Sequence, residues 1–225
     1  MTTPLQFVES LRALPAFPDV FNPWRDHDPV NDQNELGPSI RAANLERYLA
    51  ARVGKARLLL VAEAPGHRGC RVSGIAMTSE RIMLGHHPVI PHHAVFEGPK
   101  QQTSLPELHK KGANEQTAST VWGLLLSLGL APEEFVLWNA FPCHPHKPGE
   151  PLSNRAPTPK EVAACADVLR DMLTLLGTAR VVAVGRVAQR QLQVQGVEAP
   201  YVRHPAMAGI NQFREQVQAL ASSFR

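Results

Sequence analysis

Two kinds of apolar pattern alternate along this chain. In the first, a few apolar residues follow one another without interruption, which is typical of a strand buried on both faces of a parallel sheet. In the second, they recur every three or four residues, which is typical of a helix with one buried face. The first pattern occurs at Arg57–Ala62, Glu134–Trp138, Arg180–Val184 and Tyr201–Val202. The second occurs at Ser39–Arg52, Thr117–Leu128, Arg186–Val194 and around Phe213, Val217 and Leu220.

A further helix is marked by its ends as well as by its period. Thr158-x-x-Glu161 matches a capping box, Pro159 stands at the first helical position, and Gly177 follows Leu176, the last periodic residue. Strands that alternate with helices in this way indicate an α/β fold. We therefore predict a three-layer α/β/α sandwich around a central parallel sheet.

Proline is the unusual feature of the composition. The chain has 20 prolines in 225 residues, which is about 9% against a usual frequency of roughly 5%. They gather at Pro15–Pro29, Pro88–Pro106 and Pro142–Pro159, and they predict long, stiffened surface loops that are suited to carry functional residues. We expect one domain over residues 1–225, with residues 1–38 as a proline-rich arm that packs on it or extends from it.

Composition and charge exclude several classes of protein. Hydrophobic residues make up 44% of the chain and charged residues 19%, as in a globular rather than a disordered protein. No apolar stretch approaches the roughly 20 residues of a membrane span, and the first residues lack the pattern of a secretory signal. An odd number of cysteines, three, suits a reducing compartment. We expect a cytoplasmic monomer without a membrane partner.

The residues that follow the predicted strands form a candidate site. In an open parallel sheet, ligands bind in the crevice beyond the carboxyl ends of the strands. Glu63 and Asn139 directly follow two of these strands, and His204 follows a third after one intervening residue. A carboxylate, an amide and an imidazole that meet at one sheet edge predict a site for a small molecule or a nucleic-acid base.

Four segments, in order, resemble the uracil-DNA glycosylase superfamily. They are AEAPG (Ala62–Gly66), LWNAFPC (Leu137–Cys143), VAVGRVA (Val182–Ala188) and VRHPA (Val202–Ala206). The branch they resemble most is family four, whose first motif reads GEAPG and whose second reads HPA or HPS. The resemblance covers the chain from about Arg57 onward, and it implies the same α/β/α fold as the pattern of strands and helices.

The resemblance implies hydrolysis of the N-glycosidic bond between uracil and deoxyribose in DNA. Such an enzyme flips the nucleotide into a pocket and reads the edge of its base. Glu63 matches the glutamate that stabilises the sugar cation or orients water, and His204 matches the histidine that stabilises the leaving base. Asn139 matches the amide that recognises the uracil edge. Backbone groups of Ala64 and Gly66 would frame the pocket.

Two departures from family four change what is expected. Its stacking aromatic residue falls in a GxPF segment, whereas this chain reads Gly74-Ile75-Ala76-Met77, so that Met77 would form the pocket wall with a softer side chain. Family four also holds a four-iron cluster through four cysteines. Cys143 and Cys165 lie near two of those positions, but no CxxC precedes them. We therefore predict no cluster, no metal and no other cofactor.

The expected partner is uracil-containing DNA, single- or double-stranded, which would place the protein at the nucleoid. Cationic side chains around the site would neutralise phosphates, and an apolar residue after the histidine motif would wedge into the duplex. The candidates for DNA contact are Arg68, Arg71, Arg203, Met207 and Arg214.

Other readings of the sequence stay open. Met77 favours a weakly catalytic or non-catalytic protein of the same fold that binds DNA lesions. The loop with His86, His87, His92 and His93 would suit an unrelated α/β metal-dependent hydrolase if several of its imidazoles met in tetrahedral geometry. Within the glycosylase reading, hypoxanthine, thymine opposite guanine or a bulkier damaged base are alternative substrates.

Overall fold

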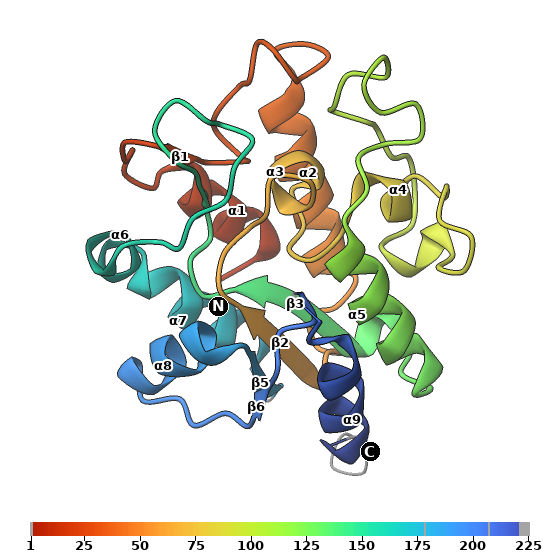
Figure 1. The fold of residues 1–225 in the computed structure, drawn as a ribbon, viewed down its shortest axis with the longest axis vertical. Helices are drawn as coiled ribbons and strands as arrows, with labels where there is room; N and C mark the ends of the chain where they lie inside the picture. Colours follow the sequence, from red (N-terminus) through yellow and green to blue (C-terminus); the bar gives the residue numbers. More distant parts are fainter. Residues whose placement is uncertain (1, 178, 207, 221–225) are drawn as a thin grey trace.

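The fold is built on four parallel strands in the order β3-β2-β5-β6 (Figure 1). The computed structural model describes residues 2–177, 179–206 and 208–220. The strands are β2 (Leu58–Ala62), β3 (Phe135–Asn139), β5 (Arg180–Val184) and β6 (Tyr201–Val202). Every residue of β2 and β3 is buried, as their uninterrupted apolar runs predict. The prediction of an α/β fold around a central parallel sheet is confirmed.

Helices cover both faces of this sheet. They are α5 (Gln116–Ser127) between β2 and β3, α6 (Pro159–Ala164) and α7 (Ala166–Leu176) between β3 and β5, α8 (Arg186–Val194) between β5 and β6, and α9 (Ile210–Leu220) after β6. Right-handed crossovers place α5 on one face and α7 and α8 on the other, because the chain moves in opposite directions along the sheet after β2 and after β3. Figure 1 shows α5 and α9 on one side of the strands and α7 and α8 on the other.

The helix predicted to start at Thr158 is interrupted at Cys165. Its start agrees with the prediction, because the Thr158 hydroxyl accepts a hydrogen bond from the Glu161 N–H and the Glu161 carboxylate accepts one from the Thr158 N–H. At Cys165 the chain makes bonds between residues three apart: its N–H donates to Val162 at 3.1 Å and its C=O accepts from Val168 at 3.1 Å. This tightened turn separates α6 from α7.

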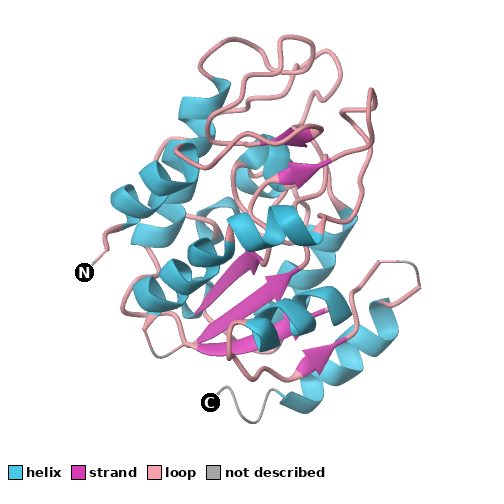
Figure 2. Cartoon of the chain, turned by 90° about the vertical axis from the view of Figure 1, so that its left-hand side faces the viewer, coloured by secondary structure: helices cyan, strands magenta, loops and turns pink. Residues whose placement is uncertain are grey.

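The N-terminal arm is more structured than its prolines suggest. It carries α1 (Pro4–Arg12), whose capping box joins Thr3 to Gln6, and a short strand β1 (Val20–Phe21). β1 pairs antiparallel with β4 (His144–Pro145), and this small pair lies apart from the main sheet in Figure 2. Neither α1 nor this pairing was predicted from the sequence. The next helix is α2 (Gly37–Ala50).

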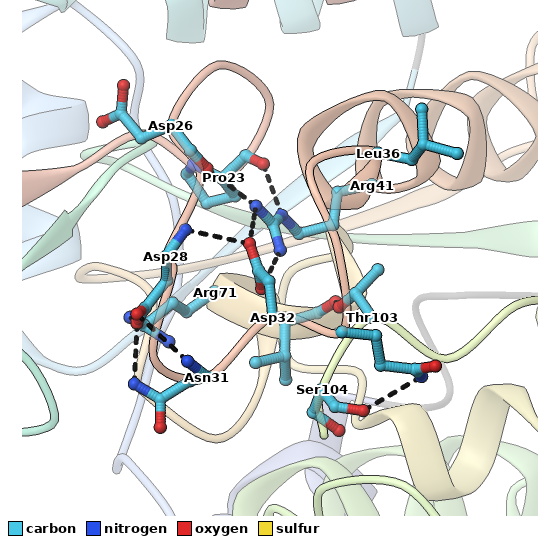
Figure 3. A network of polar contacts seen from close by, with 12 residues as sticks. Pro23, Asp26, Asp28, Asn31, Asp32, Leu36, Arg41, Arg71, Thr103 and Ser104 are labelled. Atoms are coloured by element: carbon cyan, nitrogen blue, oxygen red, sulfur yellow. Dashed lines mark hydrogen bonds and ion pairs between the residues drawn. The ribbon is translucent and has the colours of Figure 1, made fainter. Parts of the chain in front are cut away.

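Buried ion pairs fasten the arm to α2 and to the segment that follows β2 (Figure 3). The fully buried Arg41 guanidinium donates to both carboxylate oxygens of Asp32, at 2.7 and 3.1 Å, and to the carbonyl oxygens of Pro23 and Asp26 at 2.5 and 2.8 Å. The Arg71 guanidinium pairs with Asp28 of the same arm. Each of these arginines therefore has a carboxylate partner.

The long segment between β2 and α5 contains only short helices, namely α3 (Cys70–Ser73), α4 (Glu80–Met83) and the 3₁₀ turn η1 (His92–Ala94). A second 3₁₀ turn, η2 (Pro132–Glu134), precedes β3. Buried Glu80 organises this segment by accepting hydrogen bonds from the N–H groups of Thr103, Ser104 and Ala113, at 2.6 to 3.1 Å. Among the described residues, no helix combines the length and apolar character that a bilayer crossing requires.

Candidate functional site

A cavity of about 490 Å³ opens beyond the carboxyl ends of the strands. β2 and β5 are neighbours in the sheet, and the main chain turns toward opposite faces of the sheet after them. In open α/β folds, ligands bind at the point where two neighbouring strands diverge in this way. The structure brings six residues that the sequence analysis singled out together at this cavity. They are Glu63, Ala64, Gly66, Met77, Asn139 and His204.

Strand register explains why Glu63 and Asn139 meet. Ala62 of β2 and Asn139 of β3 are Cα partners. Beyond them, the Ala140 N–H donates to the Ala62 carbonyl at 2.8 Å and the Phe141 N–H donates to the Glu63 carbonyl at 3.0 Å. The first two motifs are therefore joined by a continuous backbone ladder that extends into the cavity wall.

The side chains of Glu63 and Asn139 are available to a ligand. Neither makes a side-chain hydrogen bond to any of the described residues, although Asn139 is only 3% exposed. Burial raises the pKa of the Glu63 carboxyl above its ordinary value. Both side chains line the cavity and have hydrogen-bonding capacity that the described part of the protein does not use, so this pair favours a polar ligand that completes their hydrogen bonds.

The hydrogen bonds of His204 fix its tautomer. Its Nδ1 accepts from the Ala206 N–H at 3.1 Å, so the neutral ring carries its proton on Nε2. Burial, together with the neighbouring Arg203 charge, lowers the pKa of His204 and favours this neutral form. Gly209 packs against the His204 carbonyl so closely that a Cβ there would overlap it. His204 is thus a fixed hydrogen-bond donor at the cavity.

Met77 is held in an unusual backbone conformation at the cavity wall. Its φ is 46°, in the left-handed region that side chains other than glycine rarely adopt. The surrounding loop is tied to the fold on both sides. The Trp24 indole donates to the Gly74 carbonyl at 3.0 Å, and the Trp122 indole donates to the Thr78 hydroxyl at 3.0 Å. These anchors impose the position of Met77 against its own backbone preference.

Four polar residues line the cavity besides those of the predicted strand-end site: Glu115, Thr117, Asn154 and Arg155. None of them follows a strand of the main sheet, which was the signal used. Asn154 accepts a hydrogen bond from the His67 N–H at 3.1 Å, and Arg155 forms an ion pair with Glu161 at 2.7 Å. The proline-rich clusters, which predicted functional loops, were the available signal for Asn154 and Arg155, because both lie within Pro142–Pro159.

His144 links two parts of the cavity wall from behind. It is fully buried, and its Nδ1 lies 2.9 Å from the carbonyl oxygen of Pro65, while its Nε2 lies 3.4 Å from that of Pro151. Burial lowers the pKa of His144 to about 4. The neutral ring has one N–H, and the shorter distance assigns it to Nδ1 and the Pro65 carbonyl. His144 therefore holds the backbone of the first motif.

The residues predicted to contact DNA do not share one environment. Arg68, Arg203 and Arg214 are exposed. Arg71 is 2% exposed, pairs with Asp28 and lies over the ring of Phe21 at 4.5 Å. Its burial is inconsistent with the predicted phosphate contact, and Arg71 instead fastens the arm to the loop after β2. The predicted wedge, Met207, lies outside the described residues.

Cysteines and histidines do not form a ligand set in the described part of the chain. Cys70, Cys143 and Cys165 are buried free thiols, and a cluster that needs four cysteines does not fit a chain with three. Over residues 2–177, 179–206 and 208–220, no three His, Cys, Asp or Glu side chains lie together as possible metal ligands. In the histidine-rich loop, His87 is engaged with the Ser119 hydroxyl at 3.2 Å.

Comparison with known proteins agrees with this architecture. The sequence profile of the uracil DNA glycosylase superfamily matches residues 51–222. The crystal structure of wild-type SMUG2 from Pedobacter heparinus superposes with a TM-score of 0.59 at 14% sequence identity, covering 99% of this chain and 100% of that one. At this identity the structural likeness shows the fold alone. No curated protein matches the sequence closely enough for comparison.

Proposed function

Because the chain belongs to the uracil-DNA glycosylase superfamily, we propose that it hydrolyses the N-glycosidic bond of a flipped-out uracil, or of a related deaminated base, and leaves an abasic site in DNA. The observation that carries the proposal is the convergence of Glu63, Asn139 and His204 on one cavity. A carboxylate, an amide and an imidazole N–H are the groups that this bond cleavage requires at the sugar and at the base.

Glu63 acts on the sugar side of the bond. As the bond breaks, positive charge develops on the deoxyribose, and a nearby carboxylate stabilises this oxocarbenium-like state or orients the attacking water. Only the ionised form can do so. Since burial raises the pKa of Glu63, activity rises with pH on the acidic side of the profile, as the carboxyl loses its proton.

His204 and Asn139 act on the base. The leaving uracil carries negative charge, and the His204 Nε2–H donates a hydrogen bond to one of its carbonyl oxygens. This stabilises the charge as it develops. The Asn139 amide can donate and accept at once, which matches adjacent carbonyl and N–H groups on the edge of uracil.

The remaining walls give the base its shape. Ala64 and Gly66 present backbone next to Glu63, and Met77 supplies an apolar surface for the base plane. Arg68, Arg203 and Arg214 are exposed, and we assign them to the phosphates of the DNA. Such contacts make binding weaker as the salt concentration rises.

The test is excision from labelled oligonucleotides that carry uracil in a single strand, opposite adenine or opposite guanine. Alkaline cleavage reports abasic sites, and EDTA is present throughout. We expect cleavage at uracil by the native protein, and at least a tenfold loss in both Asn139→Ala and His204→Ala. Gln193→Ala is a matched control with full activity, because Gln193 is exposed near the end of α8 that points away from the cavity.

Two other results of this excision test would contradict different parts of the proposal. If both cavity variants cleave as well as the native protein, the site assignment is wrong. If the native protein binds uracil-containing DNA without cleaving it, the cavity serves lesion recognition rather than catalysis.

A further inference from the structure

A second carboxyl group, that of Glu115, lies at the same cavity as Glu63. Glu115 immediately precedes α5, at the N-cap position, with an extended backbone (φ −121°, ψ 123°). A side chain there commonly accepts hydrogen bonds from the first N–H groups of its helix. The Glu115 side chain makes no such bond. It is directed instead against the loop that follows β2.

Two glycines make room for this carboxyl group. A Cβ on Gly69 would overlap the Glu115 carboxyl, and a Cβ on Gly66 would come within 3.2 Å of Oε1. Gly66 itself lines the cavity. Glu115 therefore occupies a space between the first-motif loop and α5 that larger residues at positions 66 and 69 would close.

Within the described chain, the Glu115 carboxyl has no hydrogen-bond or ion-pair partner. Its Oε2 is buried and unpaired, although the residue as a whole is partly exposed. A buried carboxylate without a partner is strongly disfavoured. Burial accordingly raises the pKa of Glu115 to about 7, and burial is the whole cause. A substantial fraction of Glu115 is therefore a neutral acid near pH 7.

The charges around Glu115 are consistent with a neutral carboxyl. The ionisable groups on the surrounding elements are Glu63 after β2, His67 and Arg68 in the next loop, Cys70 and Arg71 on α3, Glu80 and Arg81 on α4, Arg155 before α6 and His204 after β6. Arg71 is paired with Asp28, and Glu80 accepts hydrogen bonds from backbone N–H groups. Arg155 is already paired with Glu161. An ionised Glu115 would repel both Glu63 and a leaving base anion in the same cavity, whereas a neutral carboxyl offers an O–H donor.

We propose that Glu115 is a specificity-determining residue whose neutral carboxyl donates a hydrogen bond to a carbonyl oxygen of the flipped base. This inference rests on the proposed glycosylase function. Deamination replaces an exocyclic amino group with a carbonyl oxygen, as in cytosine to uracil or adenine to hypoxanthine. A donor at this point accepts the deaminated base, and it opposes the amino group of the parent base, which is itself a donor. Loss of the proton removes this preference.

The experiment measures kcat/KM for uracil excision between pH 5.5 and 8.5 in the native protein and in three variants. We expect native activity to fall about tenfold between pH 7 and 8.5, as the donor is lost. Glu115→Gln keeps an N–H donor at every pH, so it stays active and shows no such fall. Glu115→Ala is at least tenfold less active at pH 6. Glu133→Gln, changed in η2 before the start of β3, retains the native profile.

A parallel binding experiment separates this inference from the proposed function. Fluorescence anisotropy compares duplexes with uracil and with cytosine at the same position, at pH 6 and pH 8.5. We expect the native preference for uracil to shrink at pH 8.5 and to persist in Glu115→Gln. If no protein cleaves DNA, the catalytic proposal fails, while the pH dependence of binding still decides the role of Glu115. The same alkaline limb, or the same loss of binding preference between pH 6 and pH 8.5, in native protein and Glu115→Gln would overturn the inference.

Discussion

Buried polar groups around the N-terminal arm and at the cavity differ in whether they have hydrogen-bond partners within the protein. In the arm, the Arg41 guanidinium meets the carboxylate of Asp32 and two backbone carbonyls (Figure 3). At the cavity, Glu115 and Asn139 have no side-chain partner in the described part of the chain. The chain therefore can satisfy buried polar groups with its own atoms. At the cavity, the Glu115 carboxyl and the Asn139 amide are left without such partners among the described residues and are free to bind a ligand.

A third buried arginine, Arg52, also makes its hydrogen bonds within the protein. Its buried guanidinium donates to four carbonyl oxygens, those of Tyr48, Ala94, Val95 and Phe135, at 2.8 to 3.0 Å. It also lies over the Tyr48 ring at 3.8 Å. Here backbone carbonyl groups take the place of a carboxylate partner. By binding them, the Arg52 guanidinium connects α2, the η1 segment and β3.

The largest expected effect is in the arm. Asp32→Ala removes the partner of Arg41 and leaves a buried positive charge, which typically costs about 3–5 kcal/mol of stability. Urea unfolding followed by circular dichroism measures this loss. Replacement of both partners, Asp32→Leu with Arg41→Met, is the control, because it removes the unpaired charge. If the single variant were as stable as the native protein, the ion pair would not be a structural element.

The next effect concerns His144, which lies between the two regions. Its folded pKa of about 4 is below the ordinary value of about 6.5. Its contribution to stability is therefore complete above pH 6.5 and is lost as the pH falls toward 4, by on the order of 3 kcal/mol in total. Because Glu115 has the opposite dependence over a similar range, we expect the slope most clearly in the Glu115→Gln background.

The measurement for His144 is the free energy of unfolding at several pH values between 4 and 7, in Glu115→Gln with and without His144→Asn. The asparagine amide can still donate to the Pro65 carbonyl, but it does not titrate. We expect a steeper fall toward low pH when His144 is present. Parallel pH profiles would contradict the assignment of a buried neutral imidazole.

The smallest expected effect is a gain in stability at the cavity. The folded pKa of Glu115, about 7, is raised above its ordinary value of roughly 4.3, so its ionisation opposes folding as the pH rises from 4.5 through 7. The full shift corresponds to roughly 3.7 kcal/mol, and because Glu115 is partly exposed we expect about 2 kcal/mol of it. Glu115→Gln is thus expected to be more stable than the native protein by this amount at pH 8, and by less at pH 5. Thermal unfolding at the two pH values measures it. A loss of stability at pH 8 would mean that the chain already satisfies Glu115.

The strands of the sheet are predicted well from the sequence because a buried strand is an uninterrupted run of apolar residues. β5 and β6 coincide with the predicted segments, β2 starts one residue later than predicted, and β3 is shifted by one residue toward the C-terminus. The break at Cys165 was not predictable, because both sides of it keep the same apolar period. The helix α1 was not predicted, although Thr3 and Gln6 form a capping box, because the prolines of residues 1–38 favour a loop.

The site was predictable only where it coincides with strand ends. Glu63, Asn139 and His204 lie at or within two residues of strand ends, so topology alone gathers them. Glu115 reaches the cavity from the start of a helix, through space that Gly66 and Gly69 leave open. No local sequence pattern predicts that its side chain lies there. The burial of Arg71 depends on Asp28, which is distant in sequence and folds over it from the arm.

The pairing of β1 with β4 also constrains how the chain matures during synthesis. Val20 pairs with Pro145, so the first strand leaves the ribosome more than a hundred residues before its partner. At about 5–20 residues per second, the arm waits roughly 6 to 25 seconds. Until β4 has been synthesised, β1 has no partner strand. The segment that carries the aspartates paired with Arg41 and Arg71 lacks this contact for the same time. The nascent protein therefore completes its N-terminus late, together with the wall of its own cavity.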